Sequence, residues 1–117
     1  MNQHEFNRQL CHFLAAATTP FHAVSEMAQR LTAAGFIRLT DDVGWEVMAG
    51  GKYFLTRNDS SIVAFVSGQE DVPNAGMRMV GTHTDSPCLM VKTTPEIQSQ
   101  GLFQLGVQVY GGALLNP

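Results

Sequence analysis

Hydrophobic residues recur at helical spacing in the first third of the chain. A stripe with spacings of three and four residues predicts an amphipathic helix from about Gln3 to Ala17. Its members are Phe6, Leu10, Phe13, Leu14 and Ala17. A second helix is expected to follow, because Thr19 can cap it, Pro20 suits its first position and Gly35 suits its end. Each helix should therefore present one apolar face for packing.

After Gly35 the pattern changes to short runs rich in β-branched and aromatic residues. Strands are predicted at 36–39, 52–57, 61–66, 77–81, 89–92 and 102–110. Asn58 and Asp59 should join the second and third of these as a hairpin, and Pro95 should close the fifth. Residues 68–76 are expected to form an exposed loop, and residues 98–101 a polar turn. The order of elements favours an α/β fold with a mixed central sheet and flanking helices.

Length, composition and charge narrow the class of protein. A chain of 117 residues can form one small core. Its net charge is −3 and it has no basic cluster, so a nucleic-acid partner is not expected. No apolar run is long enough for a signal sequence or a membrane span, so no membrane partner is expected either. The two cysteines, Cys11 and Cys88, are predicted to be reduced, buried thiols of a cytoplasmic protein.

The candidate chemistry lies in the segment GTHTDSPCLMVK, residues 81–92. In extended backbone, His83 and Asp85 project from the same face and can act on one point. A histidine that binds a metal often donates its other ring nitrogen to a carboxylate, so the pair is half of a metal site. The predicted strand at 77–81 would place His83 just past a strand end, where ligands gather in α/β sheets. Taken alone, the pattern is more often a loop histidine beside a turn aspartate.

Other reactive side chains have simpler structural explanations. His22 falls in the first turn of the second helix and is expected to be structural. Ser86 lacks a nucleophile elbow and precedes Pro87, which favours a turn. Cys88 could pair with His83 as a thiol nucleophile, but no cysteine-protease signature surrounds it.

Four segments, in order, resemble successive landmarks of the aspartyl aminopeptidases, a family of zinc metallopeptidases. They are TPFHA at 19–23, TRNDSS at 56–61, GTHTDSPCLMVK at 81–92 and GVQVYGGA at 106–113. The resemblance covers essentially the whole chain, but only the first part of a family member, since these enzymes have several hundred residues. Leu115, Asn116 and Pro117 do not form a natural end, so most of the chemistry is expected beyond them.

The resemblance implies a two-domain metallo-aminopeptidase. Residues 1–94 would begin its catalytic domain, and residues 95–117 would begin an inserted dimerisation domain. The enzyme would be a cytoplasmic homo-oligomer that removes N-terminal Asp or Glu from peptides at a two-zinc site. His83 would be a zinc ligand and Asp85 the catalytic residue that orients it, while the general-base Glu and the other ligands would follow Pro117.

Two alternatives stay open at this stage. Because a catalytic zinc site needs three protein ligands, the chain alone is expected to be inactive. It could therefore be a non-catalytic truncated remnant that acts as an oligomerisation or interaction module. It could also belong to another two-metal exopeptidase, which the N-terminal residue removed by the intact protein would decide.

Overall fold

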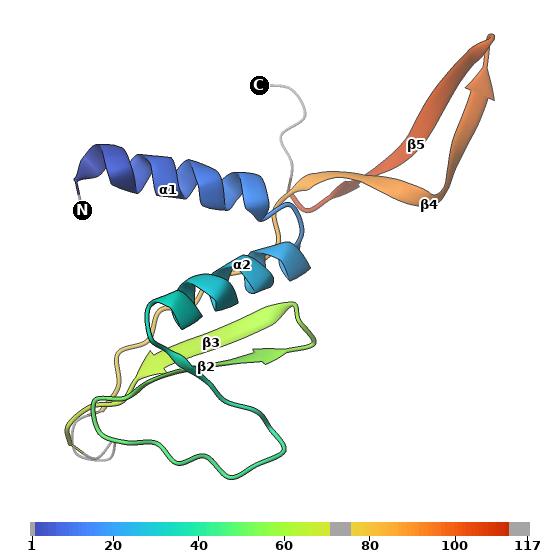
Figure 1. Ribbon diagram of the computed structural model, residues 1–117. Helices are drawn as coiled ribbons and strands as arrows, with labels where there is room; N and C mark the ends of the chain where they lie inside the picture. The colour runs from blue at the N-terminus through green and yellow to red at the C-terminus, as the bar shows by residue number, and fades with distance from the viewer. Residues whose placement is uncertain (1, 71–75, 113–117) are drawn as a thin grey trace. The chain divides into compact units, whose positions relative to one another are not determined.

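The computed structural model describes residues 2–70 and 76–112 (Figure 1). The chain divides into two compact units, Met1–Thr84 and Asp85–Pro117. The first unit contains two helices and a three-stranded sheet, and the second contains a two-stranded ribbon. The predicted mixed α/β fold is thus confirmed. The domain boundary expected near Pro95 concerns the intact protein and stays a prediction.

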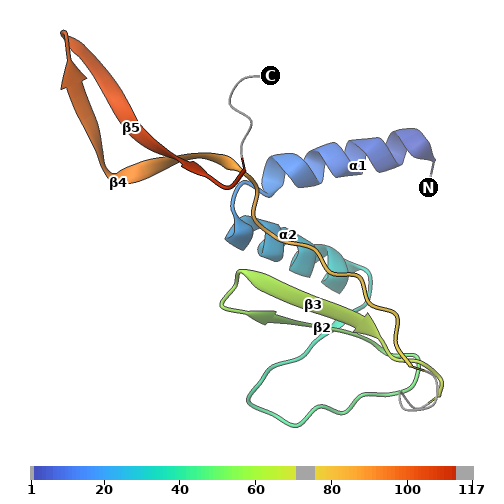
Figure 2. The same ribbon diagram turned by 180° about the vertical axis from the view of Figure 1, so that it is seen from behind.

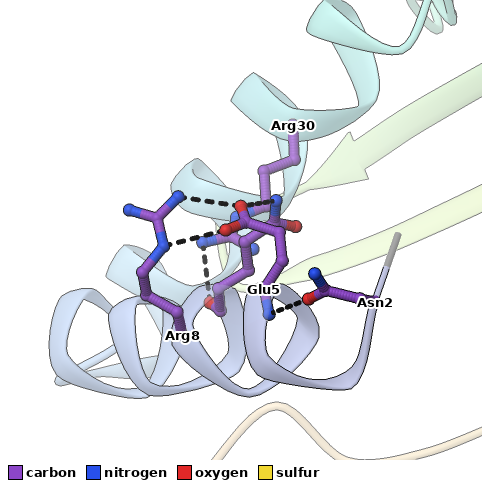
Figure 3. Close-up of polar contacts among 5 residues, drawn as sticks. Asn2, Glu5, Arg8 and Arg30 are labelled. Atoms are coloured by element: carbon purple, nitrogen blue, oxygen red, sulfur yellow. Dashed lines mark hydrogen bonds and ion pairs between the residues drawn. The ribbon is translucent and has the colours of Figure 1, made fainter.

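Helix α1, Gln3–Ala16, begins with a side-chain cap and a cluster of charged and polar groups (Figure 3). The Asn2 side chain accepts a hydrogen bond of 2.8 Å from the Glu5 backbone N–H. The Glu5 carboxylate in turn accepts from Arg8 at 2.8 Å and from the Gln9 side chain at 2.7 Å. The backbone carbonyl of Gln9 accepts a hydrogen bond from the Arg30 side chain at 3.4 Å, which links α1 to the next helix. These contacts are solvent-exposed, so they define the start of α1 more than they stabilise it.

The predicted apolar stripe of α1 is present but largely uncovered. Phe6 is 53% exposed, Leu10 is 45% exposed and Leu14 is 62% exposed. No residue of α1 is buried by the part of the chain that the structure describes. The described residues therefore leave exposed the face of α1 that was expected to pack.

Helix α2, Pro20–Ala33, has the predicted ends. Thr19 is its N-cap and accepts from the His22 backbone N–H at 3.3 Å, and Pro20 occupies the first helical position. Gly35, just past the C-terminal end, has φ +81°. That left-handed conformation suits glycine, which has no Cβ to clash there, so α2 ends where the sequence predicts.

The sheet of the first unit has the order β1-β2-β3. Its strands are β1 at Ile37–Arg38, β2 at Lys52–Arg57 and β3 at Ser61–Val66. Strand β1 is parallel to β2, and β2 is antiparallel to β3, which makes the sheet mixed. Asn58 and Asp59 both have φ +49° in the turn of the β2–β3 hairpin. Asn and Asp tolerate this conformation better than other residues with a Cβ, so the predicted hairpin is confirmed.

The core of the first unit is small and is centred on β2, in a sheet that α2 packs against (Figures 1 and 2). Among the described residues, its buried apolar members are Ala23, Val24, Tyr53 and Phe54. Alternation along β2 places Tyr53 and Phe54 on opposite faces of the strand, yet both are at most 3% exposed. The Tyr53 hydroxyl also accepts from the Met48 backbone N–H at 2.9 Å. Strand β2 is therefore the centre of this unit.

The second unit is an antiparallel ribbon of β4, Cys88–Ser99, and β5, Leu102–Tyr110. A two-residue turn joins the strands, with φ +52° at Gln100 and φ +76° at Gly101. Positive φ at both turn residues matches the twist of a tight hairpin. The turn is shorter than the predicted 98–101, because residues 98 and 99 still pair with β5.

The prediction that Pro95 ends its strand is wrong. Strand β4 continues through Pro95 to Ser99, and the pairing register shifts between Val91 and Glu96. Proline has no N–H for a ladder, but an irregular stretch of an edge strand requires none at that position. Gly106 lies opposite this irregularity and is the buried residue of β5. A Cβ added to it would lie 3.3 Å from the Pro95 carbonyl oxygen.

The strand predicted at 77–81 is not formed. Met79 is 81% exposed and Val80 is 97% exposed, and residues 77–81 pair with no other strand in the described ranges. A short apolar run signals burial, but a strand also requires a partner that presents hydrogen-bonding groups. The predicted loop at 68–76 lies partly outside the described residues.

Candidate functional site

The candidate segment follows the hairpin of the first unit and leads into β4. Its approach, drawn in gold in Figure 2, belongs to no helix or strand. His83 is exposed, whereas Thr84 and Asp85 are partly buried. The chain passes from the first unit to the second between Thr84 and Asp85, so His83 belongs to one unit and Asp85 to the other. His83, Thr84 and Asp85 lie outside helices and strands, and the strand predicted to precede them is not formed.

Thr84 anchors the motif within the first unit. Its hydroxyl donates a hydrogen bond of 2.9 Å to the backbone carbonyl of Ser60, in the turn between β2 and β3. Because the side chain of Thr84 is partly buried, this bond is shielded from competition with water. The bond fixes the residue that follows His83 against the hairpin. Sequence reasoning missed Thr84, since its partner is remote along the chain.

Tyr110 holds Asp85 within the second unit. The Tyr110 hydroxyl donates to Asp85 Oδ2 at 2.8 Å. This hydrogen bond, and then the negative charge of the carboxylate, raise the pKa of Tyr110 above its usual value. Tyr110 is the last residue of β5 and pairs in the ladder with Cys88, the first residue of β4. Tyr110 lies in one of the four segments that resemble the aspartyl aminopeptidases, but the sequence alone gave it no role in a site.

A close backbone contact completes the base of the ribbon. Gly111 has φ +75°, and a Cβ added to it would meet Pro87 Cα at 3.4 Å. A side chain at this position would therefore be strained by the backbone conformation. Together with Tyr110, Gly111 keeps the end of β5 against the residues that follow Asp85.

The remaining residues with reactive side chains are His22 and the two cysteines. The His22 ring contacts the Thr19 hydroxyl, with 2.8 Å between Nδ1 and Oγ1, as part of the α2 cap. Cys11 and Cys88 are both free thiols, as predicted, but both are exposed. The expectation that they are buried was wrong, because the apolar surfaces around them are themselves uncovered by the described chain.

His83 has the right chemistry for zinc, but the described residues do not complete a site. Within 2–70 and 76–112, no three His, Cys, Asp or Glu side chains are grouped closely enough to hold a metal ion. A catalytic zinc site requires three protein ligands. A groove of about 720 Å³ on the first unit lies between α2 and the sheet, and its lining includes neither His83 nor Asp85. The described chain therefore supplies at most part of a metal site.

Comparison with known proteins agrees with the motif. Residues 13–117 match the family of aminopeptidase I zinc metalloproteases, M18. The chain is 58% identical over 113 residues to a probable M18 family aminopeptidase 2 of Pseudomonas syringae pv. syringae. It is 53% identical over 113 residues to a protein with the same name in Azotobacter vinelandii. In both cases the match covers 97% of this chain and 26% of the relative, so the chain spans about a quarter of their length.

Solved structures give the same result. The chain is similar to Chaetomium thermophilum mApe1, with a TM-score of 0.74 and 37% identity over 90% of this chain and 25% of the other. It is also similar to the mApe1 dodecamer of Saccharomyces cerevisiae, with a TM-score of 0.78 and 25% identity. That match covers 97% of this chain and 27% of the yeast chain. No helix within the described residues is long and apolar enough to cross a bilayer. The extent of the family match shows that this chain belongs to the M18 family of aminopeptidase I zinc metalloproteases.

Proposed function

We propose that this chain is the N-terminal part of a zinc-dependent aminopeptidase that removes N-terminal Asp or Glu from peptides. The observation that carries the proposal is the His83-Thr84-Asp85 segment within a family match that spans residues 13–117. The preference for acidic residues rests on the resemblance of four ordered segments to the aspartyl aminopeptidases. The full activity requires the part of the protein that corresponds to the other three-quarters of its relatives.

In this proposal His83 binds zinc and Asp85 orients the histidine. The exposed imidazole of His83 is accessible to a metal ion, and the carboxylate of Asp85 can accept from an imidazole N–H. The bound metal would polarise the scissile carbonyl as a Lewis acid. Two zinc ions, a general-base Glu and the other ligands are proposed to depend on residues beyond Pro117, so the chain alone would be inactive.

The proposal includes a homo-oligomeric, cytoplasmic enzyme whose inserted dimerisation domain begins near Pro95. A similar protein, yeast mApe1, forms a dodecamer. The ribbon exposes large apolar side chains, among them Phe103 at 63% and Leu105 at 56%, which suits an interface. Two exposed free thiols suit a reducing compartment.

Substitutions in the full-length gene product test the assigned roles. His83→Ala should abolish hydrolysis of an aspartyl peptide, because it removes a metal ligand. Asp85→Asn should lower zinc affinity or activity about 10- to 100-fold, because it keeps the shape of the side chain but weakens the orienting contact. His4→Ala, on the exposed surface of α1, is the matched histidine control and should leave activity unchanged.

Three results would count against the proposal. Near-normal activity of His83→Ala with zinc present would refute the ligand assignment. Faster release of leucine or alanine than of aspartate or glutamate would refute the acidic preference. A gene product that ends at Pro117 and hydrolyses no peptide would favour the alternative, a non-catalytic interaction module.

A further inference from the structure

We propose that Tyr110 is a positioning residue for Asp85, holding its carboxylate in the orientation that its role in the site requires. The inference rests on the proposed function, which gives Asp85 that role. Its structural basis is the hydrogen bond of 2.8 Å from the Tyr110 hydroxyl to Asp85 Oδ2, between residues 25 positions apart. A bond from a hydroxyl to an ionised carboxylate is stronger than a bond between neutral groups.

The backbone that carries the donor is held by the ribbon. Tyr110 pairs in the β4–β5 ladder with Cys88, which lies three residues after Asp85. Gly111, the next residue, lies close to Pro87, two residues after Asp85. The ladder therefore keeps the Tyr110 backbone near Asp85, so that the hydroxyl can reach the carboxylate.

The chemistry of the carboxylate permits both contacts at once. An ionised carboxylate has about four acceptor sites on two oxygens, whereas a phenol has one hydrogen to donate. A bond from Tyr110 to Oδ2 is therefore compatible with a second donor, such as an imidazole N–H. The Tyr110 bond would limit rotation of the carboxylate and so favour one direction for that donor.

Tyr110→Phe in the full-length gene product tests the inference, since it removes the hydroxyl and keeps the ring. We expect kcat to fall about 10-fold, the lower end of the range for residues that orient a metal ligand, with KM unchanged. The matched control is Tyr53→Phe. It removes the chain's other tyrosine hydroxyl, which bonds the Met48 backbone, and should leave kcat unchanged.

A double-mutant cycle with Asp85→Asn separates positioning from a general structural effect. If Tyr110 acts through Asp85, Tyr110→Phe should cause no further loss of kcat in the Asp85→Asn background. The same four proteins should show coupling between the two residues in urea unfolding, a measurement that needs no activity.

The outcomes distinguish this inference from the proposed function. A normal kcat for Tyr110→Phe, or losses of kcat that add in the double variant, would overturn the positioning role even in an active enzyme. Coupling in unfolding without any peptidase activity in the wild type would confirm the hydrogen bond. It would also overturn the proposed function, and the catalytic importance of Tyr110 with it.

Discussion

At the scale of single residues, the three consecutive side chains of the motif have different surroundings. His83 is exposed, Thr84 donates to Ser60, and Asp85 accepts from Tyr110. The two partners lie 24 and 25 positions away along the chain. A spacing pattern can therefore mark His83 and Asp85 as candidates, but it cannot reveal the hydroxyl groups that hold the segment, because those contacts exist only after folding.

The raised pKa of Tyr110 can be measured from the pH at which its hydroxyl ionises. In a dilute solution of the 117-residue chain carrying Tyr53→Phe, Tyr110 is the only tyrosine, and its ionisation can be followed by ultraviolet absorbance. Its midpoint should lie above the usual value of about 10, and Asp85→Asn should lower it toward that value. An unchanged midpoint in Asp85→Asn would contradict the contact.

The same pKa shift has a defined sign for stability. The folded protein holds the Tyr110 proton more tightly than the unfolded chain does, because that proton makes the hydrogen bond to Asp85 and because ionisation would place two negative charges together. The contribution to stability is therefore complete below the unfolded pKa, about 10, and is lost as the pH rises through the folded pKa. The loss on alkaline titration should be smaller in Asp85→Asn.

At the scale of elements, the sequence predicted the helix ends and the hairpin turn that depend on neighbouring residues alone. Thr19, Pro20 and Gly35 fixed the ends of α2, and Asn58 with Asp59 fixed the β2–β3 hairpin. The failures at 77–81 and at Pro95 are of another kind. The apolar run at 77–81 lacks a pairing strand in the described chain, and Pro95 is accommodated by a register shift opposite Gly106. Both outcomes depend on a distant segment.

The α2 cap gives a prediction at this scale. Thr19→Ala removes the oxygen that accepts from the His22 N–H and should lower the free energy of unfolding by about 1 kcal/mol. Thr18→Ala is the matched control, because Thr18 precedes the cap and should change stability little. Urea unfolding of the full-length gene product measures both. Equal losses in the two variants would show that the cap is not the cause.

At the scale of the whole chain, many large apolar side chains of the described residues are exposed. They lie on the α1 stripe, among them Phe6 and Leu14, and along the ribbon, among them Phe103 and Leu105. Because the chain spans about a quarter of the length of its relatives, we propose that the rest of the protein covers these side chains.

The 117-residue chain produced alone should therefore self-associate. Light scattering should show a mean mass that increases with concentration, because exposed apolar strands with open edges pair with other chains. A version that ends at Thr84 lacks the ribbon and should associate less. If both versions associate equally, the ribbon is not the main contact. A cleanly monomeric 117-residue chain at high concentration would refute the prediction altogether.

The register shift at Pro95 has a consequence for the pairing register of β4 and β5. Both faces of the ribbon carry exposed apolar side chains, so hydrophobicity alone would tolerate slippage of one strand by two residues. Slippage would bring Pro95 into the regular ladder, where its missing N–H breaks a bond, and would put a side chain where Gly106 leaves room. It would also carry Tyr110 away from Asp85. The irregularity thus favours one register of β4 against β5 over others that would bury similar apolar surface.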